Sequence, residues 1–252
     1  MKISIITVCY NSEKTIGDTL RSVLEQKHEN IEHIIIDGGS TDRTLAAVAT
    51  VGAHVAKIIS EPDNGIYDAM NKGIALATGD IVGFINADDF YPSPDVLSTV
   101  ASAFESSGAD CCYGDLCYVQ QEDVSTIVRF WRSSPFASGK FSRGWCPPHP
   151  TFFVRREVYT RLGGFDLSFN IAADFELMMR YLEGAHITSR YIPQVLVKMR
   201  LGGTTNRSFI NIFKQNMEIR RALSSIGRRS SLVRFIFNKL FIRLIQFVSR
   251  PA

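Results

Sequence analysis

The sequence predicts an α/β fold, a Rossmann-like mixed sheet flanked by helices, and three observations support this prediction. Strand-like apolar runs alternate with amphipathic helix-like stretches through the first half of the chain. Runs such as IIID and IVGFI are apolar on both faces, as is typical of central parallel strands that helices cover. Aspartates and small polar residues follow directly where several of these runs end. Because ligands in such sheets bind at the carboxyl ends of the strands, these polar residues are candidate site residues.

The predicted elements follow one another without an internal repeat. In the first half, strands are expected at residues 3–8, 31–37, 53–60 and 80–86, and helices at residues 13–26, 44–51 and 67–77. In the second half, the pattern predicts a helix at 95–105, strands at 110–120 and 124–131, a loop rich in Pro, Gly and Ser at 133–150, a strand at 151–154, a helix at 173–183 and one or two strands within 187–200. We therefore expect one continuous domain over residues 1–206 and a helical tail at 207–252.

The tail is basic and amphipathic. Residues 207–252 contain ten Lys or Arg residues and one acid, a net charge of +9; because the whole chain carries +3, residues 1–206 carry −6. Apolar residues of the tail recur at spacings of three and four, with polar residues opposite: the apolar set is Val233, Ile236, Phe237, Leu240, Phe241, Leu244 and Val248, and the polar set is Arg234, Asn238, Arg243 and Gln246. Such a helix suits a membrane surface, while its charges make spanning a bilayer costly. Packing on the domain or in a dimer is the alternative.

The cysteine content and the N-terminus favour the cytoplasm. The chain has five cysteines, an odd number, and begins without the long apolar stretch of a signal peptide. Together with the basic tail, this predicts a cytoplasmic protein that is peripheral on the inner face of the plasma membrane. Nucleic acid is not an expected partner, because the basic residues of the tail are interleaved with Phe, Leu and Ile on one helix.

Carboxylates stand at the predicted end of a strand or start of a helix in three segments: Asp37, the pair Asp88 and Asp89, and Asp174. Two adjacent carboxylates that emerge from a buried strand repel each other unless a cation lies between them or one is protonated. A divalent ion held by one or two carboxylates and by phosphate oxygens is the usual form of a nucleotide site, so Mn²⁺ or Mg²⁺ is the expected cofactor. A helix cap or an Asx turn is the alternative explanation of the pair.

Several short motifs occur in a fixed order along residues 2–203. They are TVCYN at 7–11, DGGSTDRT at 37–44, DNGIYDAMNKGIALATGD at 63–80, INADD at 85–89, GGFD at 163–166 and AADFELMMR at 172–180. In these motifs the chain resembles the family 2 glycosyltransferases of the GT-A fold, including bacterial enzymes of polysaccharide and colanic-acid type. The resemblance implies an inverting, metal-dependent enzyme that moves a sugar from a nucleotide-diphosphate sugar to a hydroxyl of a lipid-linked or cell-surface glycan precursor.

The resemblance also implies a role for particular residues. Asp174 is the expected catalytic base, and Asp89 is the expected principal metal ligand with Asp88 beside it. The nucleotide sugar is expected to contact Thr7, Asn11, Asp37, Asn71, Lys72, Asp88, Arg200 and Thr204, and the Asp37 carboxylate is expected to accept a hydrogen bond from the base. The acceptor is expected near Asp115, Trp145 and His149. These implied roles require Asp37, Asp89 and Asp174 to surround one cavity.

Two positions depart from the family pattern. Ala173 stands where many members have a Glu before the catalytic Asp, and Met70 stands where many have an Arg. Lys72 either replaces that cation or is an ordinary exposed lysine. A dehydrogenase is excluded, because TVCYNSE lacks the glycine-rich turn after the first strand. A metal-dependent nucleotidyltransferase and a non-catalytic, membrane-attached module that binds nucleotide sugars remain as alternatives.

Overall fold

The computed structural model describes residues 1–202 and 209–227, together with residues 235, 238, 244, 246 and 247. These residues form one nine-stranded sheet in the order β3-β2-β1-β4-β8-β6-β9-β5, with β7 paired to β6 outside this path. The strands are β1 Ile3–Cys9, β2 Ile31–Asp37, β3 Val55–Ser60, β4 Ile81–Phe84, β5 Asp89–Phe90, β6 Cys111–Val119, β7 Ile127–Trp131, β8 Phe153–Arg155 and β9 Ser189–Arg200.

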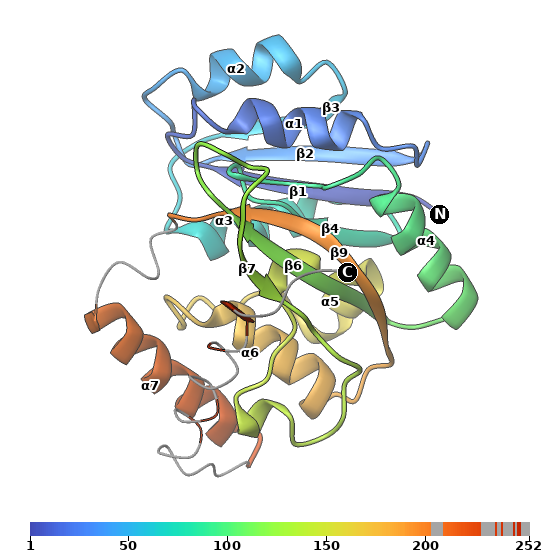
Figure 1. Ribbon diagram of the computed structural model, residues 1–252, viewed down its shortest axis with the longest axis vertical. Coiled ribbons are helices and arrows are strands. Elements are labelled where there is room, and N and C mark those ends of the chain that lie inside the picture. Colours follow the sequence, from blue (N-terminus) through green and yellow to red (C-terminus); the bar gives the residue numbers. More distant parts are fainter. Residues whose placement is uncertain (203–208, 228–234, 236–237, 239–243, 245, 248–252) are drawn as a thin grey trace.

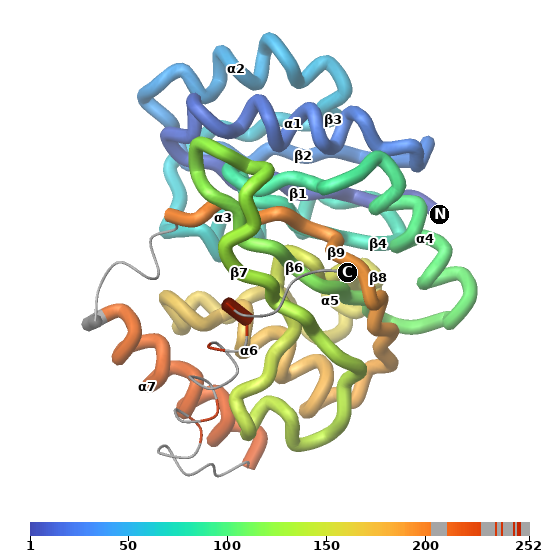
Figure 2. Tube along the Cα trace, viewed as in Figure 1, coloured from blue at the N-terminus to red at the C-terminus, as the bar shows by residue number. Residues whose placement is uncertain are grey.

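The first part of the sheet is parallel, as the runs that are apolar on both faces predict. β1 pairs in parallel with β2 and β4, and β2 pairs in parallel with β3. The second part is mixed: β8 is antiparallel to both β4 and β6, β9 is parallel to β6, and β5 is antiparallel to β9. Figure 2 shows β6 and β9 running side by side across the middle of the molecule. The predicted α/β fold with a mixed sheet is confirmed.

Helices cover both faces of the sheet (Figure 1). They are α1 Ile16–Leu24, α2 Thr44–Val51, α3 Ile66–Leu76, α4 Val96–Ser107, α5 Arg156–Leu162, α6 Ala173–Met179, which a π-helical turn at Arg180–Gly184 continues, and α7 Phe209–Ser225. Single 3-10 turns occur at Phe141–Arg143 and His149–Thr151 in the long loop after β7. In Figure 1, α1 and α2 lie above β1 and β2, while α6 and α7 lie at the opposite end.

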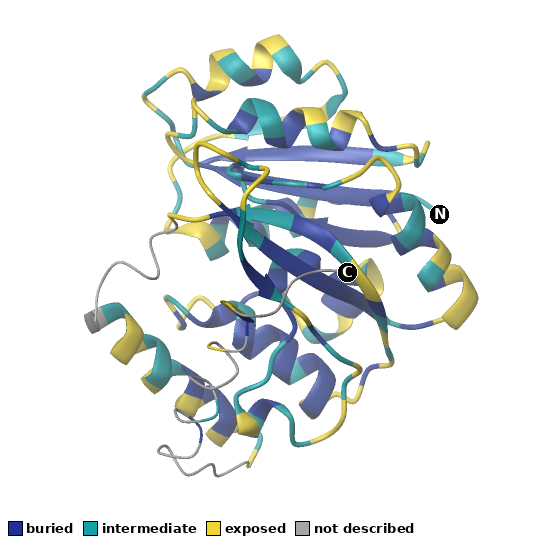
Figure 3. Ribbon diagram, in the orientation of Figure 1, coloured by how far each residue is buried: buried dark blue, intermediate teal, exposed yellow. Residues whose placement is uncertain are grey.

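The core divides according to the faces of the strands. Successive side chains of a strand point to opposite faces, so Ile6 and Val8 of β1 enter one apolar cluster while Ile3 and Ile5 enter another. The first cluster packs the sheet against α3, α5, α6 and α7, and the second packs it against α4. In Figure 3 the central strands are almost entirely buried, whereas exposed residues lie on β3, on part of β9 and on the outer faces of the helices. Burial on both faces fixes the sheet as a rigid platform for the loops that follow its strands.

Two elements escape the sequence pattern. β5 is only two residues long, Asp89–Phe90, and pairs with Met199 and Lys198 of β9. A strand of this length has no periodicity to detect. α5 at Arg156–Leu162 begins directly after β8, so its seven residues are too few for a clear helical period. β5 matters for function, because it decides which way the two neighbouring aspartates of INADD point.

The tail begins with a helix that packs on the domain. Ile219, Ala222 and Leu223 of α7 are buried in the same apolar cluster as α6. The predicted boundary between residues 206 and 207 lies outside the described residues. Over the described part of the chain, no helix combines the length and the apolar character that crossing a membrane requires.

The predicted amphipathic helix of the tail is described at only a few positions. Leu244, expected on the apolar face, is 66% exposed, whereas Gln246, expected on the polar face, is buried. The Gln246 Oε1 accepts a hydrogen bond from Nε of Arg129 at 2.6 Å, and Asn238 is half-buried. The other members of the pattern lie outside the described residues: Val233, Arg234, Ile236, Phe237, Leu240, Phe241, Arg243 and Val248.

Candidate active site

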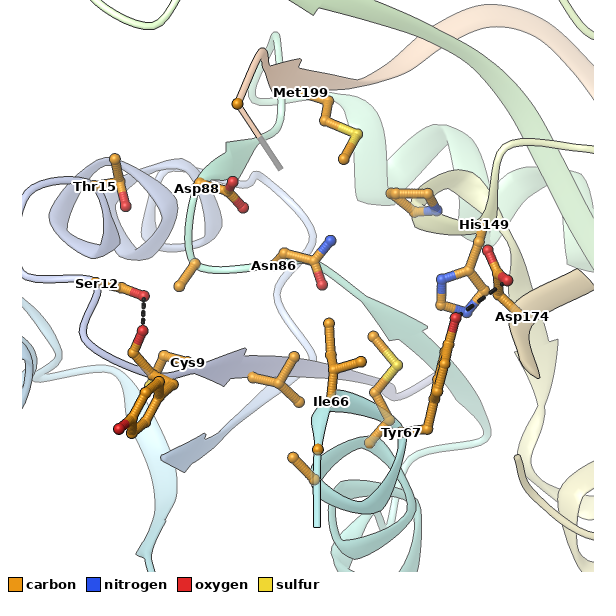
Figure 4. Close-up of a pocket in the computed structure, with 18 of the residues that line it drawn as sticks. Cys9, Ser12, Thr15, Ile66, Tyr67, Asn86, Asp88, His149, Asp174 and Met199 are labelled. Carbon is orange, nitrogen blue, oxygen red and sulfur yellow. Dashed lines mark hydrogen bonds between the residues drawn. The ribbon is translucent and has the colours of Figure 1, made fainter. Parts of the chain in front are cut away.

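A cleft of about 840 Å³ opens at the carboxyl ends of β1 and β4. Its walls come from the residues after β1, the start of α3, the turn between β4 and β5, parts of β6, β7 and β9, residues 146–150 and the start of α6. Figure 4 shows Asp88 on one side of this cleft and Tyr67, His149 and Asp174 together on the other side. The location matches the general rule that open α/β sheets bind ligands at the carboxyl ends of their strands.

The loop after β1 forms one end of the cleft. Cys9, Tyr10 and Asn11 line it, and the Tyr10 ring is 63% exposed. Asn11 has a positive φ of 49°, a conformation that Asn adopts more readily than most residues. Its Oδ1 accepts a hydrogen bond from the backbone N–H of Thr41 at 2.9 Å, and its own N–H donates to Oγ of Ser40 at 2.8 Å. Asn11 therefore both lines the cleft, as predicted, and joins the loops after β1 and β2.

Thr7 lies deeper in the fold than its predicted role requires. It is fully buried in β1, two residues before the end of the strand, and is not among the residues that line the cleft. Its Oγ1 lies 2.9 Å from Nε2 of His33, a fully buried ring. Burial and the neighbouring His54 lower the pKa of His33 to about 3, so this ring is neutral near pH 7. The side chain of Thr7 thus contributes to the packing of the sheet.

Asp37 is also buried and does not line the cleft. Its Oδ2 accepts hydrogen bonds from the Ser40 backbone N–H at 3.0 Å and from the Ser60 hydroxyl at 2.7 Å, and its Oδ1 accepts one from the Ser40 hydroxyl at 2.5 Å. Burial raises the pKa of this carboxyl, but the hydrogen bonds outweigh burial and the net shift is downward. The charged carboxylate therefore holds the loop after β2. The structure does not bring it to the cleft.

The two aspartates of INADD have opposite environments. Asp88 lines the cleft and is half-buried, whereas Asp89 is fully buried at the start of β5 and does not line it. Burial raises the pKa of both carboxyls, and the charge of Asp88 raises that of Asp89 further. In this structure the pairing of β5 with β9 turns the Asp89 side chain into the protein, where its Oδ1 has no hydrogen-bond partner among the described residues, and its role as principal metal ligand stays a prediction. Asp88 is the carboxylate of this pair that lines the cleft.

Asn86 joins Asp88 on the cleft wall (Figure 4). Its amide nitrogen donates a hydrogen bond to Oδ2 of Asp89 at 3.0 Å, which fixes the orientation of the amide. Its buried Oδ1 has no hydrogen-bond partner among the described residues. A carboxylate and an unpaired amide oxygen on one wall fit a hard divalent cation. Over the described residues, no group of three or more His, Cys, Asp or Glu side chains could hold a metal alone, so phosphate and water oxygens have to complete such a site.

Arg200 supports the INADD turn from behind. Its guanidinium donates hydrogen bonds to the backbone oxygen of Asp88 at 2.9 Å and to Oδ2 of Asp18 at 2.5 Å, and it lies over the ring of Phe90 at 5.0 Å. The residue is buried and is not among those that line the cleft, and its contact with the donor stays a prediction. Thr204, the other residue predicted near the diphosphate, lies outside the described residues.

Asn71 and Lys72 fasten α3 to neighbouring loops. The Asn71 side chain makes two hydrogen bonds with the backbone of Phe165, at 2.9 and 2.8 Å. The Lys72 ammonium pairs with Glu61 at 2.8 Å, and neither residue lines the cleft. Met70 does line it, at the position where many family members have Arg. Lys72 thus does not supply the missing cation in this structure.

Asp174 faces the cleft from the first turn of α6. Its Oδ1 accepts a hydrogen bond from the backbone N–H of Phe175 at 2.8 Å and lies 3.2 Å from the hydroxyl of Tyr67. The buried ring of His149 also lines the cleft, between the rings of Phe84 and Phe165 at 5.5 and 5.4 Å. Burial lowers the pKa of His149, against a smaller opposite effect of the Asp174 charge. His149 is therefore neutral near pH 7, and the Asp174 carboxylate lines this side of the cleft with it.

Asp115 and Trp145, predicted on the acceptor side, do not line the cleft. The Asp115 carboxylate is buried, where it accepts hydrogen bonds from the Ser133 N–H at 2.7 Å and the Tyr191 hydroxyl at 2.8 Å. Trp145 packs in an aromatic cluster with Tyr113, Phe136 and Phe141. Asp115 of β6 and Trp145 of the loop after β7 both turn toward the core in this structure, and an acceptor contact by either residue stays a prediction.

The comparison with known families agrees with this geometry. Residues 4–163 match the sequence model described as Glycosyl transferase family 2. The chain belongs to this family. An uncharacterized glycosyltransferase of Mycobacterium tuberculosis (strain ATCC 25618 / H37Rv) is 36% identical over 180 residues, which are 71% of this chain and 68% of the relative. A PGL/p-HBAD biosynthesis glycosyltransferase of Mycobacterium bovis (strain BCG / Pasteur 1173P2) is 30% identical over 208 residues, 81% of this chain and 78% of the relative.

Solved structures share the fold of this glycosyltransferase. Residues 1–349 of S. aureus TarS, in complex with UDP-GlcNAc, match with a TM-score of 0.72 and 17% identity, over 96% of this chain and 73% of that one. The mannosyltransferase PcManGT from Pyrobaculum calidifontis, in complex with GDP-Man and Mn²⁺, matches with a TM-score of 0.65 and 19% identity, over 96% of this chain and 69% of that one. At these identities the likeness shows the fold alone, and the predicted GT-A fold is confirmed.

The cleft of the glycosyltransferase also contains residues that the sequence reasoning missed. They are Tyr10, Tyr67 and Asn86 within the motifs named above, and Tyr118, Trp131 and Met199 on strands β6, β7 and β9. Tyr10 and Asn86 follow the ends of β1 and β4, so their position at strand ends was a usable signal. Trp131 offered no such signal, because it reaches the cleft only through the pairing of β7 with β6, where it lies opposite Leu116.

Proposed function

We propose that this family 2 glycosyltransferase is an inverting, metal-dependent enzyme that transfers a sugar from a nucleotide-diphosphate sugar to an acceptor hydroxyl. One observation carries the proposal: Asp88 and Asp174 line one cleft from different sides, at the carboxyl ends of the strands (Figure 4). Inversion requires a leaving group on one face of the anomeric carbon and a base on the other. Two carboxylates on different sides of one cleft meet that requirement without a covalent intermediate.

The leaving-group side is assigned to Asp88 and Asn86, which would hold Mn²⁺ or Mg²⁺. A bound divalent cation neutralises the negative charge that grows on the departing diphosphate. Asp88 supplies a carboxylate, the unpaired Oδ1 of Asn86 supplies a second oxygen, and Asp89 orients the Asn86 amide from behind. Arg200 holds the Asp88 backbone in place. These contacts preorganise the wall, so little free energy is lost when a charged diphosphate binds.

Removal of the proton from the acceptor hydroxyl is assigned to Asp174. In this mechanism its free carboxylate oxygen takes the proton of the acceptor hydroxyl during attack on the anomeric carbon. The Phe175 N–H and the Tyr67 hydroxyl lie within hydrogen-bond distance of Oδ1 and restrain the rotamer of the side chain. His149 stays neutral because burial lowers its pKa, so it places no positive charge beside Asp174.

The nucleoside is assigned to the end of the cleft at β1. There Tyr10 offers an exposed ring for stacking on a base, and Asn11, Asp42 and Asp63 line the same end. Asp37 acts on the base only through the loop that it holds. Tyr118 and Trp131 replace Trp145 as the proposed apolar and aromatic surface for the acceptor.

The acceptor is proposed to be a lipid-linked or cell-surface glycan precursor, reached from the cytoplasmic face of the plasma membrane. α7 presents three exposed apolar side chains, Ile212, Phe213 and Met217, while Asn211 of the same helix lines the cleft. An apolar face next to the cleft, on a basic tail, fits a surface-bound enzyme whose acceptor stays in the membrane.

The membrane proposal is tested by flotation with vesicles that contain anionic lipid. The full chain is expected to float with the vesicles, and a chain ending at Gly227 is expected to bind less. Equal flotation of the two chains would show that residues 228–252 do not contribute to attachment, and it would leave the exposed side chains of α7 as the membrane contact.

The function is tested by incubating the full chain with UDP-, dTDP- and GDP-sugars and either Mn²⁺ or EDTA, and by measuring the nucleoside diphosphate released. We expect release with one donor class in Mn²⁺ and a loss of about 10²- to 10⁴-fold on Asp174→Asn, with nucleotide binding retained. Binding without turnover by the wild-type chain would instead favour the non-catalytic module. Release of pyrophosphate from a nucleoside triphosphate would favour the nucleotidyltransferase.

A further inference from the structure

The segment that precedes α6 is anchored by one side chain from the tail. The backbone N–H groups of Asn170, Ile171 and Ala172 all donate hydrogen bonds to the carboxylate of Glu218 in α7, at 3.0, 2.9 and 2.9 Å. Ala172 is the N-cap residue of α6 and has no side chain that can cap the helix. Glu218, the one acid of residues 207–252, supplies the acceptor atoms that this helix start lacks.

The anchored segment is directly connected to Asp174. The carbonyl oxygen of Ile171 lies 3.0 Å from the Tyr67 hydroxyl, which in turn lies 3.2 Å from Oδ1 of Asp174. Only Ala173 lies between Ala172 and Asp174. A shift of the segment therefore moves Asp174, or removes its restraint by Tyr67, without any change in the donor side of the cleft.

α7 is held in place by contacts other than those of Glu218. Ile219, Ala222 and Leu223 are buried in the core, and Arg221 donates hydrogen bonds to the backbone oxygen and hydroxyl of Ser168 at 2.8 and 3.0 Å. The Arg221 guanidinium also lies over the ring of Phe169 at 3.7 Å. Loss of the Glu218 charge should therefore leave the helix docked. Its effect should be confined to the three amides that it binds.

We propose that Glu218 is a positioning residue, through which α7 fixes the location of the base Asp174. The inference rests on the proposed function, because it assigns a role relative to that base. A Gln side chain at this position keeps the length and offers one acceptor oxygen where three N–H donors converge. Its amide N–H₂ then faces at least one of those donors, so the segment cannot keep its present position.

The test compares nucleotide-sugar turnover by Glu218→Gln with that of two controls, in the full chain with Mn²⁺. For Glu218→Gln we expect kcat to fall about 10- to 100-fold, because a misplacement of Asp174 by about 1 Å has a cost of this size. The KM for the donor and the Kd for the nucleoside diphosphate should stay within about threefold of the wild-type values. Glu157→Gln, an exposed acid of α5, removes the same charge elsewhere and should change neither. Leu223→Ala removes buried contacts of α7; it should lower Tm more than Glu218→Gln does, and kcat less.

The outcomes separate this inference from the proposed function. An unchanged kcat in Glu218→Gln, alongside loss of turnover in Asp174→Asn, overturns the role of Glu218 and leaves the proposed function intact. A kcat that follows Tm across both α7 variants also overturns it, because that is the behaviour of a purely structural contact. If wild type transfers no sugar, or Asp174→Asn retains full turnover, the proposed function fails and the inference fails with it.

Discussion

Exchanging each aspartate of INADD for asparagine tests the structural assignment of the cleft. Asp88→Asn removes the carboxylate that lines the cleft, whereas Asp89→Asn changes a fully buried side chain. The two substitutions are chemically identical and adjacent in sequence. A difference between them can therefore come only from the direction in which each side chain points.

The size of the expected difference follows from electrostatics. Two unit charges about 4 Å apart interact by about 4 kcal/mol at an effective dielectric constant of ~20, and a divalent cation about doubles this value. Because Asp88 is only half-buried, we take a smaller value of about 2.7 kcal/mol, which corresponds to a loss of ~10²-fold in kcat. Asp89→Asn keeps the shape of the side chain and an oxygen that can accept the Asn86 hydrogen bond. We expect it to reduce kcat by less than about tenfold.

The assay is release of nucleoside diphosphate as a function of Mn²⁺ concentration. Asp88→Asn should raise the Mn²⁺ concentration for half-maximal activity as well as lower kcat, while Asp89→Asn should leave that concentration near the wild-type value. The reverse order, with Asp89→Asn inactive and Asp88→Asn nearly normal, would refute the assignment and restore Asp89 as the principal ligand.

Three further predictions concern the base and the stability of the fold. Tyr67→Phe removes the hydroxyl near Asp174, so kcat should fall about 3- to 10-fold with an unchanged donor KM in steady-state assays. Glu32 is buried, and burial alone would raise its pKa. Hydrogen bonds, chiefly from Ser4 and Thr78, have the larger effect and lower its pKa from 4.5 to about 2. A carboxyl whose pKa is lower in the folded state than in the unfolded state stabilises the fold at pH values above the unfolded-state pKa. Glu32→Gln should therefore reduce the free energy of unfolding, measured in urea, by about 2 kcal/mol at pH 7. The difference should vanish as the pH falls from 4.5 towards 2. Gly73→Ala would place a Cβ 2.4 Å from Cγ2 of Ile6, so urea unfolding should show a loss of about 1–3 kcal/mol.

Each of these predictions can fail separately. A rise in donor KM without a change in kcat would contradict the assigned contact of Tyr67 with the base. A stability difference for Glu32→Gln that persists at pH 2 would show that the hydrogen bonds do not depend on the charge. A Gly73→Ala variant as stable as the wild type would show that α3 can move away from β1 without cost.

The fold was largely predictable because it depends on patterns that are local in the sequence. The apolar runs of β1, β2 and β4 are continuous, and the helices between them have a clear period, so element type and the parallel arrangement could both be inferred. The motif order likewise pointed to the family and to the strand ends as the site. Only short elements such as β5 lacked a pattern that could be read.

The residues that form the site were less predictable, because their exposure is decided by contacts between distant segments. Asp88 and Asp89 are equivalent in the sequence, and only the pairing of β5 with β9 turns one into the cleft and the other into the protein. Trp145 was a reasonable aromatic candidate until the packing of its ring became known. Glu218 binds amides 46 to 48 residues earlier in the chain. The sequence by itself thus determined which elements form and which chemistry is present, because both depend on local pattern and residue type. The tertiary structure decided which carboxylates line the cleft, because that depends on strand pairing and packing between distant segments.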